Sequence, residues 1–113
     1  MSTIQVVFLT SDKVGADEPA LGSRLMTGVV DLLDQLPVLV KSVLLTNTAV
    51  FLATKNSDTI TSLKRLEGQG VEILVCTTCL NHFGLMESLQ VGKASDAKTI
   101  LSTMVLADKV LKF

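Results

Sequence analysis

The two cysteines are the most reactive side chains of the chain, and they frame the motif Cys76-Thr77-Thr78-Cys79. The apolar run that ends at Cys76 predicts a buried strand, and the residues after it predict a helical turn. A thiol at such a junction faces backbone N–H groups without carbonyl partners, which favour the thiolate over the thiol. Cys76 is therefore the predicted nucleophile, able to attack an activated sulfur atom and hold it as a persulfide.

Other interpretations of the cysteine pair stay open. In one, the thiols pack as small apolar side chains, and the loops around them hold a small ligand or a partner without catalysis. In another, the motif carries dithiol redox exchange, as Cys-x-x-Cys does in cytosolic α/β proteins. The chain lacks the usual context of such a redox site, because it has no Trp and both prolines precede the motif.

Metal and cofactor sites have weaker support. Structural zinc takes four ligands, and this region supplies only Cys76, Cys79 and His82. His82, three positions after Cys79, could modulate that thiolate, although a lone histidine is more often a partly buried side chain with one hydrogen bond. The chain contains neither Gly-x-Gly-x-x-Gly nor a phosphate loop. We therefore predict no metal and no cofactor.

Length and composition predict one domain with an apolar excess. The chain has 113 residues, and its 10 basic and 11 acidic side chains leave a formal charge of −1. The chain has no excess of positive charge that would attract the phosphate backbone of a nucleic acid, so nucleic acid is not a predicted partner. Apolar residues make up 48% of the chain and the mean hydropathy is +0.51, which is high for a small monomer. We therefore expect a homo-oligomer that buries apolar surface between subunits.

Neither a membrane span nor a secretory signal is predicted. The longest apolar stretches, such as Val38–Leu45, are interrupted and stay far below the ~18 residues that a span requires. The amino terminus, Met1 to Gln5, has no basic region that leads into an apolar one. We therefore expect a cytoplasmic protein in a reducing environment, where both cysteines stay thiols.

Apolar runs alternate with segments of helical periodicity along the chain, which is typical of strands linked by helices. The predicted strands are Ile4–Leu9, Ser42–Thr46, Val71–Cys76 and Lys109–Phe113. The predicted helices run from Pro19 to Leu36, from Asn56 or Ser57 to Gly68, and from a cap at Ser95 to Ala107, with a loop over 47–52. In the first helix the apolar stripe is Leu21, Leu25, Val29, Leu32 or Leu33, and Leu36.

This alternation predicts an α/β fold with a mainly parallel sheet and helices on both faces, in a single domain over residues 1–113. In such sheets, ligands gather where the carboxyl ends of strands meet helices. The loops there cover 10–18, 46–54 and 76–79. Their polar side chains make Asp12, Asn47, Thr77 and Thr78 candidate binding residues beside the candidate catalytic pair, Cys76 and Cys79.

One block of sequence is more specific than the rest, Gly70-Val71-Glu72-Ile73-Leu74-Val75-Cys76-Thr77-Thr78-Cys79-Leu80. Further matches are Ala20–Met26, Thr46–Val50, Val91-Gly92 and Ala107–Val110. In this order the motifs resemble the DsrE-like family, and within it the carboxyl-terminal domain of YedF-type proteins of selenium metabolism. The resemblance runs nearly end to end.

The resemblance implies a three-layer α/β/α domain with about five strands, related to sulfur-relay subunits that assemble as dimers, trimers or hexamers. It implies that Cys76 accepts sulfur as a persulfide from a small carrier protein and passes it on, in sulfur relay or selenium metabolism. Cys79 matches the second cysteine of YedF-type domains and could resolve a persulfide or tune its neighbour.

Departures from the YedF-type pattern change the expected partners. Those proteins usually carry a TusA-like amino-terminal domain, whereas this chain begins at the DsrE-like strand, so a TusA-like carrier would act in trans. The motif usually reads Cys-Gly-Thr-Cys and here reads Cys-Thr-Thr-Cys. The chain has Lys93–Lys98 where relatives often have Thr-Asn-Met-Tyr, so a loop expected to border the site loses polar and aromatic groups.

Overall fold

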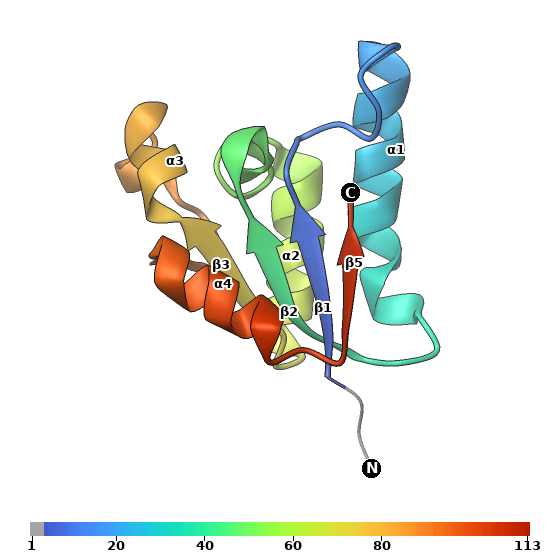
Figure 1. Ribbon diagram of the computed structural model, residues 1–113. Helices are drawn as coiled ribbons and strands as arrows, with labels where there is room; N and C mark the ends of the chain where they lie inside the picture. Colours follow the sequence, from blue (N-terminus) through green and yellow to red (C-terminus); the bar gives the residue numbers. More distant parts are fainter. Residues whose placement is uncertain (1–3) are drawn as a thin grey trace.

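A parallel sheet of five strands forms the centre of the molecule (Figure 1). The computed structural model describes residues 4–113. The strands lie in the order β4-β3-β2-β1-β5, and each neighbouring pair is parallel. They span Gln5–Leu9 (β1), Val40–Leu45 (β2), Glu72–Cys76 (β3), Lys93–Ser95 (β4) and Lys109–Lys112 (β5). The predicted α/β fold with a mainly parallel sheet of about five strands is confirmed.

Helical segments connect successive strands. The α-helices are α1 (Pro19–Leu32), α2 (Ser57–Gly68), α3 (Thr77–His82) and α4 (Ala97–Val105). The short 3-10 helices are η1 (Leu33–Gln35), η2 (Asn47–Ala53) and η3 (Met86–Ser88). The segment predicted as a loop over 47–52 is thus mostly η2, in which backbone hydrogen bonds form without a strong helical sequence pattern.

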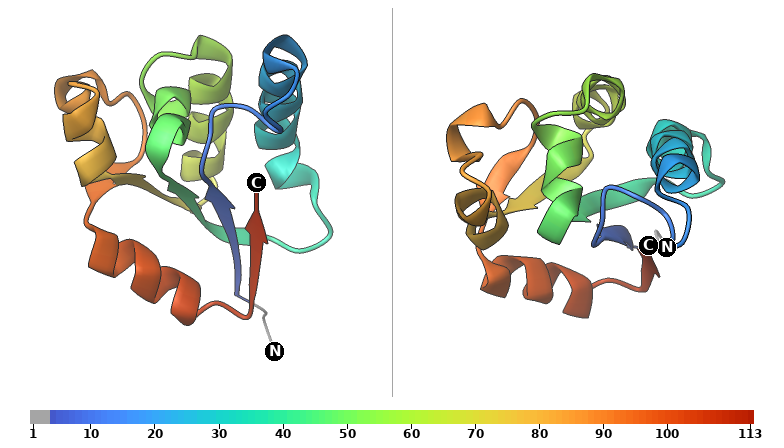
Figure 2. Two further views of the ribbon diagram at one scale, coloured as in Figure 1. Left: turned by 45° about the horizontal axis from the view of Figure 1, so that its top comes forward. Right: turned by 90° about the horizontal axis from the view of Figure 1, so that it is seen from above.

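Helices α1 and α2 lie on one face of the sheet and α4 on the other (Figure 2). The strands advance from β1 to β4 across the sheet, and α4 then carries the chain back so that β5 pairs with β1. We call the side covered by α1, α2 and η2 the first face and the side crossed by α4 the second face. The predicted placement of helices on both faces is confirmed.

The two faces bury different amounts of apolar side chain. Successive residues of a strand point to opposite faces, so in β2 Leu45 packs in the first-face core and Leu44 in the second-face core. The first-face core extends through α1, η2 and α2 and contains most of the buried aliphatic residues. The second-face core is small, and its buried members are Val6, Leu44, Leu74, Cys76 and Ile100.

Most of the leucines that predict α1 are not on its buried side, although Leu33, the alternative to Leu32, is buried just beyond the helix and Val29 packs against the first-face core. The buried residues of this helix are Gly22, Met26 and Val30. The exposed leucines of the stripe are Leu21 (49% exposed), Leu25 (46%), Leu32 (52%) and, beyond the helix, Leu36 (40%). Because α1 carries apolar residues on more than one side, helical spacing alone does not identify the side that packs on the sheet.

Helix starts were predicted with mixed success. The predicted start of α2 at Asn56 or Ser57 is confirmed: the helix begins at Ser57, and Asn56 caps it, since its Oδ1 accepts the backbone N–H of Asp58 at 3.1 Å. The predicted cap of the last helix is wrong: Ser95 ends β4, and Asp96 caps α4 by accepting the N–H of Thr99 at 3.2 Å. The short strand β4 exists through its pairing with β3, which its own three residues do not signal.

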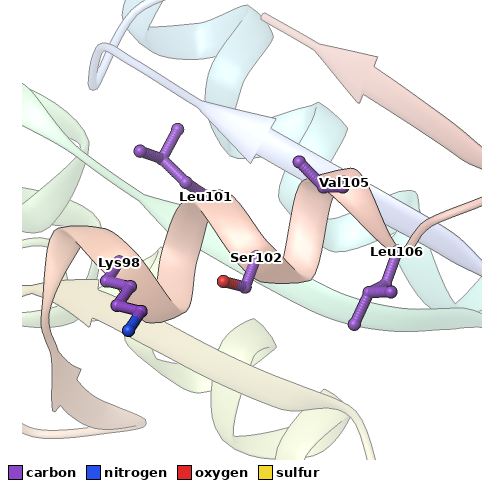
Figure 3. Close-up of a pocket in the computed structure, with 5 residues that line it drawn as sticks. All are labelled: Lys98, Leu101, Ser102, Val105 and Leu106. Atoms are coloured by element: carbon purple, nitrogen blue, oxygen red, sulfur yellow. The ribbon is translucent and has the colours of Figure 1, made fainter.

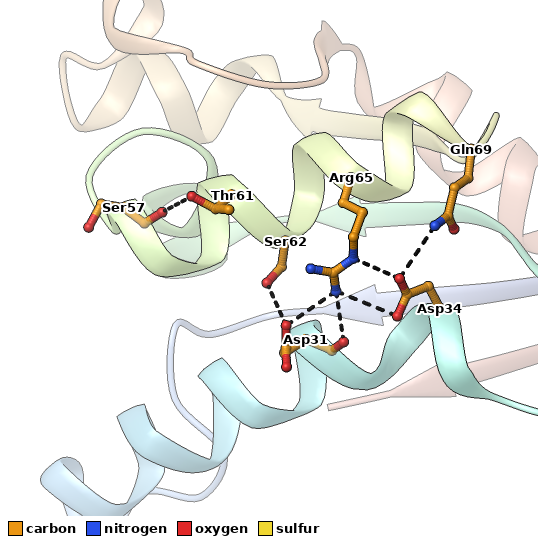
Figure 4. Close-up of polar contacts among 7 residues, drawn as sticks. All are labelled: Asp31, Asp34, Ser57, Thr61, Ser62, Arg65 and Gln69. Atoms are coloured by element: carbon orange, nitrogen blue, oxygen red, sulfur yellow. Dashed lines mark hydrogen bonds and ion pairs between the residues drawn. The ribbon is translucent and has the colours of Figure 1, made fainter.

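An ion-pair network joins α2 to the end of α1 on the first face (Figure 4). Arg65 Nε donates to Asp34 Oδ2 at 2.7 Å, and Arg65 Nη2 donates to Asp31 Oδ1 at 3.2 Å. Ser62 Oγ also donates to Asp31 Oδ1, at 3.2 Å. The hydrogen bond from Arg65 lowers the pKa of Asp34. These polar contacts hold the two helices side by side outside the apolar core.

Residues 1–3 lie outside the described part of the chain, and most of the amino-terminal segment on which the absence of a secretory signal is predicted lies there. Between residues 4 and 113, no helix is long and apolar enough to cross a membrane. The single domain over residues 1–113 stays a prediction.

Candidate functional site

The loops that follow β1, β2 and β3 meet at the carboxyl edge of the sheet. The backbone N–H of Asp12 donates to Thr48 Oγ1 at 3.2 Å, which joins the loop after β1 to η2. The backbone N–H of Asn47 donates to Cys79 Sγ at 3.1 Å, which joins η2 to α3. Parallel strands present all their carboxyl ends at one edge, so residues far apart in the sequence become neighbours here.

Cys76 is the last residue of β3 and lies beneath the surface. It is 7% exposed and packs in the second-face core beside Leu74 and Ile100. Among the described residues, no N–H group at the start of α3 donates to its side chain. The hydrogen bonding predicted for the Cys76 thiol is therefore not formed, because its side chain belongs to the apolar core.

Cys79 lies one helical turn after Cys76 and is the more accessible thiol. It is partly buried and packs against the cores of both faces. Burial raises the pKa of the Cys79 thiol, and the neighbouring Cys76 thiol raises it further, whereas the N–H of Asn47 lowers it without reversing the rise. Both cysteines are free thiols.

Asn47 presents its N–H group to Cys79 from an uncommon backbone conformation. Its φ of 53° lies in the left-handed region, which asparagine tolerates better than most other residues with a Cβ atom. This conformation turns the chain from the extended backbone of Thr46 into η2. The residue type at position 47 therefore helps to aim a hydrogen-bond donor at the Cys79 sulfur.

An open pocket of about 240 Å³ lies beside Cys79. It is lined by Asn47, Thr78, Cys79, His82 and Phe83. The ring of Phe83 packs edge-on against Phe51, with centroids 4.8 Å apart, and against the His82 ring at 4.9 Å. These contacts hold an aromatic wall at the pocket, so the pocket offers both apolar contact and hydrogen-bonding groups to a small substituent.

Comparison with known proteins decides the family. A family model described as the DsrE/DsrF-like family matches residues 6–113. The chain belongs to this family. DsrE/DsrF-like proteins are associated with sulfur relay, and the resemblance predicted from the motifs is confirmed at the level of this family.

A solved structure supports the same fold. The crystal structure of the YchN protein from E. coli matches with a TM-score of 0.65 and 21% sequence identity, over 98% of this chain and 100% of that chain. At this identity the likeness concerns the fold alone. No curated protein matches the chain. The finer resemblance to YedF-type domains stays a prediction.

The structure brings together part of the predicted site of this DsrE/DsrF-like domain. The predicted residues that line the pocket are Asn47, Thr78 and Cys79. Thr77 is partly buried in the first turn of α3 and is not among the lining residues. The Asp12 carboxylate pairs with Lys13 Nζ at 3.1 Å and likewise lies outside the lining. The roles assigned to these residues stay predictions.

The aromatic wall was missed in the sequence. The chain has only four Phe and neither Trp nor Tyr, and two of those four, Phe51 and Phe83, meet beside the pocket. Because the chain has so few aromatic residues, each could have been considered as a possible site residue. The contact between the two rings could not be predicted, because the residues are far apart in the sequence. His82, considered as a modulator of the thiolate, is exposed at the pocket. Within residues 4–113, no group of three or more His, Cys, Asp or Glu could hold a metal ion.

Proposed function

We propose that this DsrE/DsrF-like domain is a sulfurtransferase-like protein that holds sulfane sulfur as a persulfide on Cys76, in sulfur relay or selenium metabolism. The observation that carries the proposal is the pair of free thiols at the end of β3, one buried and one beside an open pocket. A transferable persulfide needs a thiol that reacts and surroundings that shelter the product from water and reductants. The second-face core around Cys76 provides that shelter.

The loading step is an exchange between sulfur atoms and needs no added oxidant. A thiolate of the domain attacks the outer sulfur of a donor persulfide, R–S–SH, and forms a new S–S bond while the S–S bond of the donor breaks. The donor leaves as a thiolate and takes up the proton that the attacking thiol released. An acceptor nucleophile later removes the outer sulfur from Cys76 and regenerates the thiol.

The donor in this proposal is a small TusA-like carrier protein that acts in trans. The pocket of about 240 Å³ accepts a single persulfidated side chain rather than a folded domain. The carrier would therefore dock over α3 and place only its cysteine in the pocket. Both cysteines must be reduced to be loaded, which is why we place the protein in the cytoplasm.

The test is intact-mass spectrometry after incubation of the reduced protein with a persulfide donor. The wild type should gain about 32 Da per chain, one sulfur atom, and lose it again on reduction. The Cys76→Ala variant should fail to protect the added sulfur, so its gain should decay faster than that of the wild type after excess donor is removed. Asn81→Ala, on the exposed side of α3, is the matched control and should behave as the wild type.

Failure of loading would favour one of the other interpretations. If the wild type gains no mass, the pocket would serve a binding module without sulfur chemistry. If mild oxidation instead removes about two mass units and links Cys76 to Cys79, the pair would be a dithiol exchange site. Either result would contradict the persulfide proposal.

The homo-oligomer expected from the apolar excess is also a proposal, and we assign its contact to the outer side of α4 (Figure 3). This surface, which we call the α4 surface, forms a groove lined by Lys98, Leu101, Ser102, Val105 and Leu106. Its large apolar residues are Leu101 (58% exposed), Val105 (81%) and Leu106 (74%). A second copy of the chain is the proposed occupant.

Charge arrangement along α4 favours a second copy packed antiparallel. Lys98 lies near the amino end of the helix, and Asp108 follows its carboxyl end. In an antiparallel pair, Lys98 of each copy lies near the carboxyl end of α4 in the other copy, where the free carbonyl groups of that helix and the partner's Asp108 carry negative charge. This arrangement favours the contact. The net charge of −1 adds little repulsion between copies.

Sedimentation velocity at micromolar concentration tests this contact. The wild type should sediment as an oligomer, and Val105→Glu should shift it to smaller species because a carboxylate is buried in an apolar seam. Leu25→Glu, on the exposed stripe of α1, is the matched control and should keep the wild-type distribution. A monomeric wild type, or a larger shift for Leu25→Glu, would contradict the assignment.

A further inference from the structure

We infer that Cys79 is the receiving thiol, which takes sulfur from the donor at the pocket and hands it to Cys76 for storage. This inference rests on the proposed function and assigns the two thiols consecutive steps. We call Cys79 the outer thiol and Cys76 the inner thiol.

Accessibility separates the two thiols. A donor sulfur must reach its target along the line of the breaking S–S bond, so a thiol in the core is shielded from a donor attached to a large molecule. The inner thiol is 7% exposed and does not line the pocket. The outer thiol lines the pocket and is the only cysteine that does so within the described residues.

Hydrogen bonding also favours the outer thiol as the first to react. Its sulfur accepts the N–H of Asn47 at 3.1 Å, a contact that stabilises negative charge on this atom. A thiolate and the anion of a persulfide both carry such charge, so the same donor serves the attack and its product. The inner thiol receives no comparable bond from the start of α3.

The position of the two thiols allows the sulfur to move between them. Cys76 immediately precedes α3 and Cys79 is the third residue of that helix, and the two thiols are close enough for Cys76 to affect the pKa of Cys79. Both contact the second-face core, of which Cys76 is a buried member. Burial is the main reason that the pKa of the Cys79 thiol is raised, and the neighbouring Cys76 thiol raises it further.

The relay consists of two balanced exchanges. First, Cys79 attacks the outer sulfur of R–S–SH, the S–S bond of the donor breaks, and the products are R–SH and the Cys79 persulfide. Second, Cys76 attacks the outer sulfur of the Cys79 persulfide, and that S–S bond breaks as the Cys76 persulfide forms. The proton of Cys76 passes to the Cys79 thiolate that is released. Neither step needs an added oxidant or reductant, because each is an exchange between a thiol and a persulfide.

The experiment compares two donors of different size, glutathione persulfide and inorganic tetrasulfide, on the full chain. Sulfur is located on each cysteine by peptide mass spectrometry at short times. With glutathione persulfide, Cys79→Ala should load Cys76 at least about tenfold more slowly than the wild type, because the bulky donor meets only the shielded thiol. With the small tetrasulfide, the same variant should stay within about threefold of the wild type.

Two further variants complete the design. Cys76→Ala should accumulate sulfur on Cys79, since the second exchange has no acceptor. Asn81→Ala changes the exposed side of α3 without removing a thiol or altering a residue that lines the pocket, and it should load Cys76 at the wild-type rate with both donors.

The outcomes separate this inference from the proposed function. If Cys79→Ala loads Cys76 as fast as the wild type with glutathione persulfide, or slows equally with both donors, the relay is overturned while sulfur carriage by Cys76 stands. Absence of sulfur on Cys79 in Cys76→Ala would overturn the relay in the same way. Absence of sulfur from both cysteines of the wild type would overturn the inference and the proposed function together.

Discussion

The two faces of the sheet differ in how completely helices cover them. The first face is closed by α1, α2 and η2, whereas α4 alone crosses the second face. The two cysteines follow this division, because Cys76 belongs to the small second-face core and Cys79 contacts the cores of both faces. The difference indicates that the first face supplies most of the folding free energy, while the second face shelters the inner thiol and exposes the α4 surface.

The largest expected effect comes from matched truncations in β2. Leu45 and Leu44 are adjacent, have no exposed surface, and pack on the first and second faces respectively. We expect Leu45→Ala to lower the free energy of unfolding by about 3–5 kcal/mol and Leu44→Ala by about 2–3 kcal/mol, since the smaller core relaxes more readily around a cavity. Urea denaturation measures both. An equal or larger loss for Leu44→Ala would show that the second face is packed as tightly as the first.

The second prediction concerns the turn that leads the chain into β4 before it crosses to the second face. Gly92 has φ 76°, and an added Cβ would lie 2.7 Å from the carbonyl oxygen of Ile73. We expect Gly92→Ala to destabilise the fold by about 2–4 kcal/mol, because backbone strain and a backbone clash combine.

Gly84 is the matched control for Gly92, since its φ is 66° and nothing lies within 4 Å of an added Cβ. Gly84→Ala should cost only about 1 kcal/mol, from the left-handed conformation alone. Thermal unfolding of the two variants would show similar losses if the close approach to Ile73 were unimportant, which would contradict the prediction.

The third prediction sharpens the contrast between the thiols. The pKa of Cys79 is raised by burial and by Cys76, so its thiolate fraction at neutral pH is reduced and its alkylation should accelerate as the pH rises. In Cys76→Ala the contribution of Cys76 disappears, and the alkylation profile should move to lower pH. Cys76→Ser keeps a hydrogen-bonding group and should lie nearer the wild type. Identical profiles for Cys76→Ala and the wild type would rule out interaction between the two thiols.

The smallest effect is expected at the exposed polar link of the first face. Arg65 lowers the folded-state pKa of Asp34, so the pair stabilises the fold above the unfolded-state pKa of this carboxyl, and the stabilisation is lost as the pH falls through the lowered value. Arg65→Met should therefore be slightly less stable than the wild type at pH 7, and the two should converge in acid. A difference that persists in acid below the lowered pKa, once the Asp34 carboxyl is protonated, would assign the effect to packing rather than charge.

Local patterns predicted the elements with clear periodicity or capping groups. The strands that became β1, β2, β3 and β5 were all found, and the start of α2 was placed correctly at Asn56 or Ser57. The exceptions have a common cause. Strand β4 is short and depends on its partner, and Ser95 resembles a helix cap although it occupies the last position of that strand. Their structure comes from pairing with β3, which no local pattern encodes.

The candidate site, like the fold, was predicted in part. The cysteine motif, Asn47 and Thr78 were placed at the carboxyl edge of the sheet, because the ends of parallel strands must meet there. The choice of Cys76 as the reactive thiol relied on N–H groups that do not donate to its side chain in the described structure. Phe51 and Phe83 were missed because the contact between their rings spans distant parts of the chain.

The sequence by itself determined the alternation of strands and helices, the parallel sheet that follows from it, and the two cysteines after one strand end. These properties depend on local periodicity and on the geometry of parallel strands, which act over a few residues. The tertiary structure alone decided that Cys76 is buried and Cys79 faces a pocket, and that α4 leaves an apolar surface exposed. Burial depends on which elements pack over a side chain, and here α4 reaches Cys76 only because the chain returns across the sheet to place β5 beside β1.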